Sequence, residues 1–195
     1  MKKLYIFFIM IAGLSYKQTT HTSMALIAVA VSQGNKIPSV LNQGQKVKVS
    51  KYKGTELTAT DSSIVEISVP SDGTNTHIFT GLKPGHTRIM QKIKDSNGHE
   101  KDKRVADIHV AYTQLSELPS EMNLDGNLYV TKKDHHDTLE QTNRNDTNAG
   151  TVKIKTIKHN GQQSFKIHAT NSGPVDLKDD QGNKKTITVR KNTNK

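Results

Sequence analysis

The chain of 195 residues contains no cysteine and no tryptophan, and aromatic residues make up only 5% of it. The missing thiols exclude disulfides, thiolate catalysis, cysteine-ligated zinc and lipid attachment at a lipobox cysteine. The scarcity of aromatic side chains argues against a nucleic-acid surface, where bases stack on aromatic rings between basic groups. We therefore expect no nucleic-acid partner and no covalent cross-link in the core.

Apolar residues are also sparse, at 32% of the chain. A typical globular chain has roughly 45 to 50%, although that figure includes glycine. Thin cores of this kind favour two small modules over one larger domain. Thr, Val, Ile, Asn, Asp and Gly recur in short alternating runs, a pattern typical of strands joined by tight turns. The composition therefore predicts an all-β protein.

The N-terminus has the order of a secretory signal. Two lysines precede the apolar run Leu4–Leu14, which is shorter than the roughly 20 residues of a membrane-spanning helix. Ser23 and Ala25 supply the small residues that a signal peptidase requires. We expect a signal peptide over residues 1–25, export to the periplasm or the cell surface, and no further membrane span. An uncleaved N-terminal anchor is the alternative.

The charge of the chain is positive but evenly spread. Its formal net charge is +10. Residues 26–119 carry 12 basic and 9 acidic side chains, and residues 120–195 carry 13 and 9. No basic stripe marks a dedicated nucleic-acid module. A mildly basic surface attracts anionic polymers of a cell envelope, which makes such polymers candidate partners.

Four strand-like runs follow one another in the first half of the chain. They cover Ile64–Val69, Ile78–Phe79, Ile89–Ile93 and Val105–Val110, and the turn sequences SDGTN, GLKPG and DSNG separate them. Gly, Asn and Asp in these turns adopt positive φ at little cost. Short strands at this spacing predict a small β-sandwich.

The same order of features returns between residues 151 and 189. A DDQG turn repeats the DSNG turn, and the last strand ITV repeats IHV. The other matched positions are Val65 and Val152, Ile67 and Ile154, Phe79 and Ile167, Gly85 and Gly173, and Ile89 and Leu177. The repeat predicts two modules in tandem, over residues 26–119 and 120–195.

The first module carries a recognisable set of motifs. DSSIVEIS (Asp61–Ser68) precedes FTGLKPGHTRI and a closing IHV, and GQKVKV (Gly44–Val49) fits an opening strand. Over residues 36–111 this resembles the bacterial immunoglobulin-like domain of group 2, found in intimin and invasin-type adhesins. The resemblance implies an immunoglobulin-like β-sandwich in an exported chain, without a particular ligand. The hairpin DSNGHEKDKRVAD is longer than the family pattern, and the second copy lacks the DSS signature.

FTGLKPGHTRI also contains the ingredients of a phosphate-binding loop. Such a loop needs four residues between its glycines, then lysine and a helix. Only three residues separate Gly81 from Gly85, His86 stands in place of the lysine, and a strand pattern follows. We therefore interpret the stretch as a type II turn in which Pro84 presets φ and Gly85 takes positive φ.

One cluster has side chains of the metal-binding kind, namely Asp134, His135, His136 and Asp137. Adjacent histidines point apart on a strand and converge on a loop, so this spacing does not specify a site. We expect a polar loop over residues 132–150, long or disordered from Leu139 to Gly150, and no bound cofactor. A metal-binding protein that uses the cluster is an alternative.

No catalytic motif is present, neither G-x-S-x-G nor H-E-x-x-H. His109 and His168 alternate with apolar neighbours, which predicts that both lie on the solvated faces of strands. We therefore expect a non-enzymatic exported interaction module, either a structural subunit of an envelope assembly or a surface adhesion protein. Its partners would be other envelope or surface proteins. A carbohydrate- or polyanion-binding domain is the other alternative.

Overall fold

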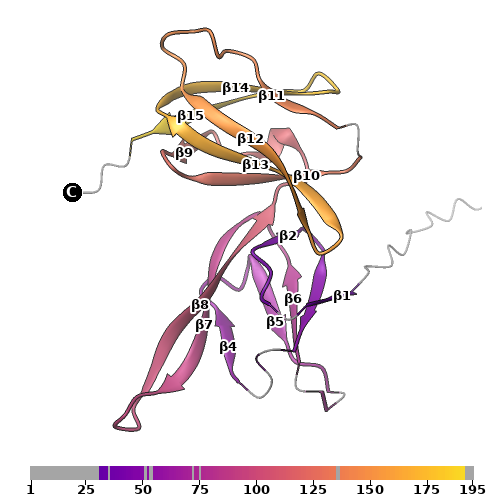
Figure 1. Ribbon diagram of the computed structural model, residues 1–195, viewed down its shortest axis with the longest axis vertical. Coiled ribbons are helices and arrows are strands. Elements are labelled where there is room, and N and C mark those ends of the chain that lie inside the picture. Colours follow the sequence, from indigo (N-terminus) through magenta and orange to yellow (C-terminus); the bar gives the residue numbers. More distant parts are fainter. Residues whose placement is uncertain are drawn as a thin grey trace, which may run out of the picture.

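Figure 1 shows a computed structural model, which describes residues 31–191 except 35, 51, 53, 54, 72, 75, 135 and 136. The expected signal peptide lies outside the described residues. Within them every regular element is a β-strand apart from one turn of 3-10 helix, η1 (Leu115–Glu117). The predicted all-β class is therefore confirmed. No helix in this described part of the chain is long and apolar enough to cross a membrane.

The strands up to residue 111 form the first sandwich, called module 1 below. They form two four-stranded sheets, in the orders β1-β3-β6-β5 and β2-β8-β7-β4. The strands are β1 (Val31–Gly34), β2 (Val40–Asn42), β3 (Lys46–Val49), β4 (Leu57–Ala59), β5 (Val65–Ser68), β6 (His77–Gly81), β7 (Gly85–Lys94) and β8 (Glu100–Ala111). All four predicted strand runs correspond to members of this set.

Alternation of side chains builds the core of module 1. In β3, the fully buried Val47 and Val49 alternate with Lys46 and Lys48, because successive side chains point to opposite faces. Phe79 of β6 and Ile89 of β7, one from each sheet, are also fully buried. Each such side chain stabilises the fold by about 1.5 to 3 kcal/mol, so this thin core depends on a few residues.

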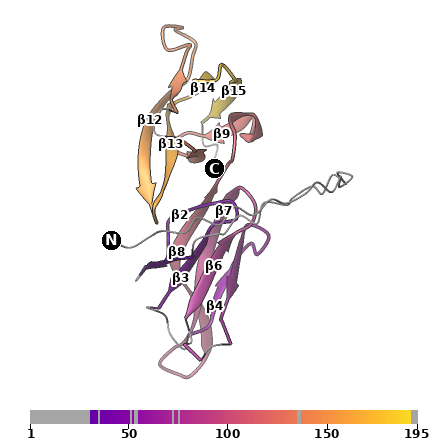
Figure 2. The same cartoon turned by 90° about the vertical axis from the view of Figure 1, so that its right-hand side faces the viewer.

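The strands from residue 121 onward form the second sandwich, module 2. Its sheets have the orders β10-β13-β12 and β11-β14-β15-β9, and Ile167 and Leu177 are fully buried between them. The strands are β9 (Glu121–Asn123), β10 (Asn127–Lys132), β11 (Leu139–Gln141), β12 (Thr151–His159), β13 (Gln162–Asn171), β14 (Gly173–Asp179) and β15 (Lys184–Arg190). Figure 2 shows the two modules placed end to end.

Two details differ from the sequence-based expectations. Leu139–Gln141, inside the expected loop, is strand β11 and pairs with β14, and the segment after it is held by hydrogen bonds such as Asn143 Nδ2 to the Pro174 carbonyl at 3.1 Å. Leu115 and Leu118 pack in the core of module 2, although they precede the expected boundary at residue 119. The polypeptide thus changes module soon after β8 ends.

The stretch FTGLKPGHTRI carries the chain from one sheet to the other, from β6 to β7. The Leu82 amide donates to the Ile64 carbonyl at 2.8 Å, which anchors the bend. Gly85 has the expected positive φ, but at +150°, whereas the type II turn that we predicted needs about +80°. That turn type is therefore wrong. Gly85 is instead the first residue of β7.

Candidate functional site at the module junction

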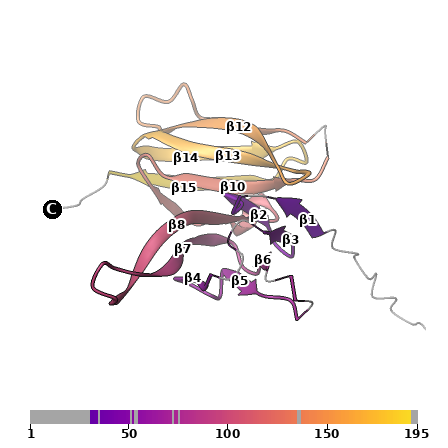
Figure 3. The same ribbon diagram turned by 60° about the horizontal axis from the view of Figure 1, so that its bottom comes forward.

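The end of β8 leads directly into module 2. The Tyr112 amide donates to the Tyr129 carbonyl at 2.9 Å, and the Thr131 amide donates to the Tyr112 carbonyl at 2.8 Å. Tyr112 thus pairs with β10 as a short parallel bridge. Figure 3 shows β10 of module 2 lying beside β8. The connection is consequently a hydrogen-bonded strand segment that joins the two modules.

An apolar cluster lies between the modules. Val40 and Ala111 of module 1 pack with Tyr129 and Ile157 of module 2. Val40, Ala111 and Tyr129 are 2%, 0% and 8% exposed. These side chains point away from the core of their own module, because their strand neighbours fill it. Each module therefore supplies a second apolar surface, which the other module covers.

A chain of polar side chains crosses the same boundary, and we call it the polar clasp. Asn42 donates through Nδ2 to Gln162 Oε1 and accepts through Oδ1 from Ser164 Oγ, the latter at 3.1 Å. Ser164 Oγ lies 2.8 Å from His159 Nε2. Asn42 is only 8% exposed and Ser164 is fully buried. Loss of either side chain would therefore leave a buried polar group without its hydrogen-bond partner.

The Ser164–His159 pair has the spacing of a nucleophile and its base, which the sequence did not reveal. Catalysis would require Ser164 Oγ to reach a substrate, but the side chain is 0% exposed and its hydroxyl donates to Asn42. His159 Nε2 must then be protonated and donate its N–H hydrogen bond to Ser164 Oγ. The pair is accordingly part of the junction, and its geometry does not suit acyl transfer.

Three rings pack against one another at the junction with interplanar angles of 38° and 42°, and we call them the ring stack. The ring centroids of His86 and His109 are 4.6 Å apart, and those of His109 and Tyr129 are 4.7 Å apart. His86 Nε2 lies 3.2 Å from Asp107 Oδ1. The sequence pattern gave the correct strand face for His109 but the wrong environment, because module 2 covers that face.

Burial at the junction keeps two imidazoles uncharged. Burial, helped by the charge of His86, lowers the pKa of His109 to about 4, which Asp107 opposes and Lys166 reinforces. Burial also lowers the pKa of His159, and the Val40 carbonyl opposes that shift. An uncharged form is expected for both rings at neutral pH, since a buried charge is costly.

The ring stack borders a groove of about 190 Å³ between the modules. His86, His109 and Tyr129 line it together with Asn127 and Tyr112. The groove combines imidazole, phenol and amide groups, which suits the positioning of a polar ligand. It is formed by both modules, so it exists only in the docked arrangement.

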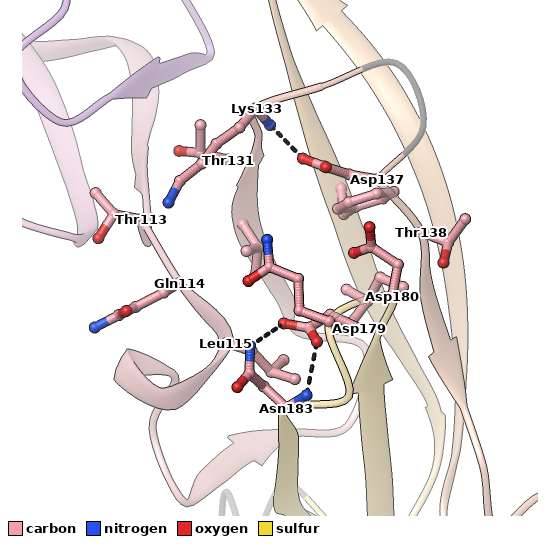
Figure 4. A pocket seen from close by; sticks show the side chains of 14 residues that line it. Thr113, Gln114, Leu115, Thr131, Lys133, Asp137, Thr138, Asp179, Asp180 and Asn183 are labelled. Atoms are coloured by element: carbon pink, nitrogen blue, oxygen red, sulfur yellow. Dashed lines mark hydrogen bonds between the residues drawn. The ribbon is translucent and has the colours of Figure 1, made fainter.

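A smaller cavity of about 100 Å³ lies within module 2 and is drawn in Figure 4. Two of its three carboxylates serve their own loops: Asp137 accepts from the Lys133 amide at 2.7 Å, and Asp179 accepts from the Asn183 amide at 2.8 Å. These are bonds of the kind that Asp makes in turns. Asp137 and Asp179 are therefore explained by loop structure.

The predicted metal cluster is described only in part. Asp134 and Asp137 lie in the loop after β10, and His135 and His136 fall outside the described residues. In the described part of the chain, no group of three or more His, Asp or Glu side chains is arranged to hold a metal ion. The metal-binding alternative stays a prediction.

No family model and no curated protein matches the sequence. Among solved structures, domains 5-6 of the S-layer protein SbsC are 15% identical, with 86% of this chain and 96% of that one covered and a TM-score of 0.33. An endo-fucoidan hydrolase of glycoside hydrolase family 107 is 15% identical, with 82% and 29% covered and a TM-score of 0.23.

A third structure is SGBP-B of the Bacteroides ovatus mixed-linkage glucan utilization locus, in complex with a mixed-linkage heptasaccharide. It is 10% identical, with 82% of this chain and 45% of that one covered and a TM-score of 0.24. Likenesses this weak carry no argument about the present chain. The resemblance of residues 36–111 to the group 2 immunoglobulin-like domain also stays a prediction.

Proposed function

We propose that this chain is an exported, non-enzymatic interaction protein that works as a stiff two-module unit in an envelope assembly or at the cell surface. The observation that carries the proposal is the junction, where a backbone bridge, an apolar cluster, the polar clasp and a ring stack act together. Modules joined in this way keep their relative orientation. A partner that binds one module is then held at a fixed position relative to the other.

The long hairpin of module 1 is the feature that such a unit would present. Strands β7 and β8 stay paired out to Lys94 and Glu100, and Figure 1 shows the hairpin extending away from the sandwich. Lys92 pairs with Glu56 at 2.9 Å, and charged residues alternate along its edge, which discourages indiscriminate strand addition. Interaction proteins built on sandwiches present loops and sheet edges of this kind.

The stiffness is tested by small-angle X-ray scattering of the purified two-module protein. We expect one compact end-to-end arrangement, and an increase in flexibility when Asn42→Ala and Ser164→Ala are combined. Asn183→Ala is the matched control, because its amide serves a turn of module 2 away from the junction. A wild-type profile of two freely reorienting modules would overturn the stiffness proposal.

The export and partner claims are tested by fractionation followed by affinity capture from intact envelopes. We expect the protein in the periplasmic, surface or secreted fraction, together with envelope or surface proteins. A purely cytoplasmic location would overturn the proposed compartment. Recovery from the envelope without any reproducible companion protein would contradict the interaction role.

A further inference from the structure

The outward face of the sheet β10-β13-β12 carries a cluster of basic side chains beside the junction. Because alternate residues of a strand share a face, the pairing register defines two neighbouring rows on it. The first row is Asn127, His168 and Lys153, and the second is Tyr129, Lys166 and Lys155. Core side chains such as Ile167 point to the other face, so both rows belong to the surface of module 2.

The lysines in these rows are close together and lack carboxylate partners. Lys155 lies directly opposite Lys166, with Cβ atoms about 5 Å apart in such a pair, and Lys153 follows two residues along, about 7 Å away. No carboxylate among the described residues forms an ion pair with any of the three. Like charges placed directly opposite each other destabilise a sheet, and a bound anion would remove that cost.

The hairpin of module 1 gives its lysines a different register. There Lys92 lies opposite Asp102, and Lys94 lies opposite Glu100. Both pairs place opposite charges across the ladder, which is the stabilising arrangement. On module 2 the ladder instead places two like charges, Lys155 and Lys166, opposite each other.

Module 1 forms one side of this basic surface. Tyr129, in the same row as Lys166, stacks on His109, and the 190 Å³ groove opens beside Asn127. Lys166 lies close enough to His109 for its charge to help burial lower the pKa of that ring. We define the basic corner as Lys153, Lys155, Lys166 and His168 together with this groove.

We propose that the basic corner binds an anionic glycan, a sugar chain that carries sulfate, phosphate or carboxylate groups. The lysines would contact the anionic groups, and Asn127 and the imidazoles beside the groove would bind hydroxyls. A nucleic acid fits less well, because bases need open aromatic faces, whereas Tyr129 is 8% exposed and its ring stacks on His109. This proposal rests on the docked arrangement under the proposed function, since module 1 supplies part of the groove.

The test measures binding of defined probes to the purified two-module protein at low and at high salt. The probes are a heparin oligosaccharide for sulfate, an oligogalacturonate for carboxylate, uncharged dextran, and oligothymidylate. We expect binding of at least one charged glycan, weaker at high salt because exposed charges are screened. Comparison of the first two probes identifies which anionic group the corner prefers.

Two double variants with equal loss of charge locate the site. Lys155→Gln with Lys166→Gln should weaken glycan binding about tenfold, as expected for the loss of two charge contacts at the surface. Lys101→Gln with Lys103→Gln removes two exposed lysines of β8 and should leave binding nearly unchanged. Thermal unfolding of both variants confirms that they fold.

Three results would overturn the proposal. They are equal weakening by the two double variants, no binding of any charged glycan by the wild type, and tighter binding of oligothymidylate than of either glycan. X-ray scattering separates this proposal from the previous one. If the two double variants weaken glycan binding equally and scattering shows a stiff particle, only the proposed glycan site is disproved. If scattering shows freely reorienting modules and the Lys155 and Lys166 variant still weakens binding, the docked arrangement is disproved. The glycan site would then consist of the lysines of module 2 alone.

Discussion

Modules 1 and 2 repeat one topology but differ in which hairpin is long. Seven strands match in order: β3-β6-β5 corresponds to β10-β13-β12, and β2-β8-β7-β4 corresponds to β9-β15-β14-β11. The parallel pairs match too, β2 with β8 and β9 with β15. In module 1 the hairpin β7–β8 is extended and free, whereas in module 2 the hairpin β12–β13 is extended and reaches the other module. Equivalent scaffolds thus have a free long hairpin in one copy and a docked long hairpin in the other.

The agreement extends to single turns. Asp95 and Asp179 accept from the amides of His99 and Asn183 at 3.0 and 2.8 Å. Gly85 and Gly173 both have positive φ, +150° and +132°, at the crossing between sheets. Such matching detail is expected if the two modules share one architecture, and it lets equivalent positions be compared directly.

The largest effects are expected from the equivalent core positions. Phe79 and Ile167 are both fully buried. Phe79→Ala should lower the free energy of unfolding by about 4 kcal/mol and Ile167→Ala by about 3 kcal/mol, because each leaves a cavity. Calorimetry of both variants measures the comparison. If the junction couples the modules, both variants also destabilise the neighbouring module, and two fully independent transitions would contradict that coupling.

The two crossing glycines should respond unequally. A Cβ at Gly173 would lie 2.5 Å from the Gly150 amide nitrogen, whereas one at Gly85 would lie 2.8 Å from the end of the Ile64 side chain. Backbone cannot move aside as a side-chain end can. We expect Gly173→Ala to cost about 3 kcal/mol and Gly85→Ala about 1 to 2 kcal/mol, measured by denaturant unfolding. Equal costs would show that the module 2 crossing is less tightly packed than described.

The polar clasp should contribute less than either core. Asn42→Ala leaves the Ser164 hydroxyl buried without its acceptor, and we expect a loss of about 1 to 2 kcal/mol. Asn123 stands at the equivalent turn of module 2, where its side chain is exposed, so Asn123→Ala should cost less than about 0.5 kcal/mol. Thermal unfolding of the two variants compares them, and equal losses would mean that the clasp contributes nothing.

The junction is also expected to respond to pH. Burial lowers the pKa of His109 to about 4 and lowers that of His159, against 6.5 for free imidazole. As pH falls, these histidines therefore become protonated in the unfolded state before they do in the folded state. Their contribution to the free energy of unfolding is complete above pH 6.5 and declines towards pH 4. His86, Asp107, Lys166 and Tyr129 surround His109 and modulate this loss.

The measurement is the unfolding temperature at pH 7 and pH 5 for the wild type and for His109→Gln with His159→Gln. We expect the variant to lose less on acidification than the wild type. It should still lose some stability, because burial also lowers the pKa of His77 in module 1. An identical loss in both proteins would contradict a role for the junction histidines.

Local sequence patterns were sufficient for the four strand runs of module 1 and for their repetition in module 2, but they missed the short strand β11. The predicted strand runs contain Val65, Phe79 and Ile108, which are fully buried in the core of module 1, and the DSNG and DDQG turns form with the same Asp hydrogen bond. These features depend on neighbours along the chain, and strand periodicity reports them directly.

The junction could not be predicted in the same way. Alternation showed that His109 faces away from its own core, but it does not show whether another module covers that face. Leu115 and Leu118 follow the last strand of module 1 yet pack in module 2. The Asn42–Ser164 contact joins residues 122 positions apart. Contacts of this kind depend on how two folded modules meet. The local sequence pattern carries no information about that.

The parallel pairing of an early strand with the last strand of each module has a mechanical consequence. In each module an early strand lies parallel to the final one, as Val40–Asn42 lies along His109–Ala111 and Glu121–Asn123 along Thr188–Arg190. Tension that separates the start of a module from its end pulls such strands in opposite directions along their axes. Their ladder hydrogen bonds are then loaded in shear, all at once, and cannot open one after another. A chain held at both ends would therefore resist extension through these two short ladders.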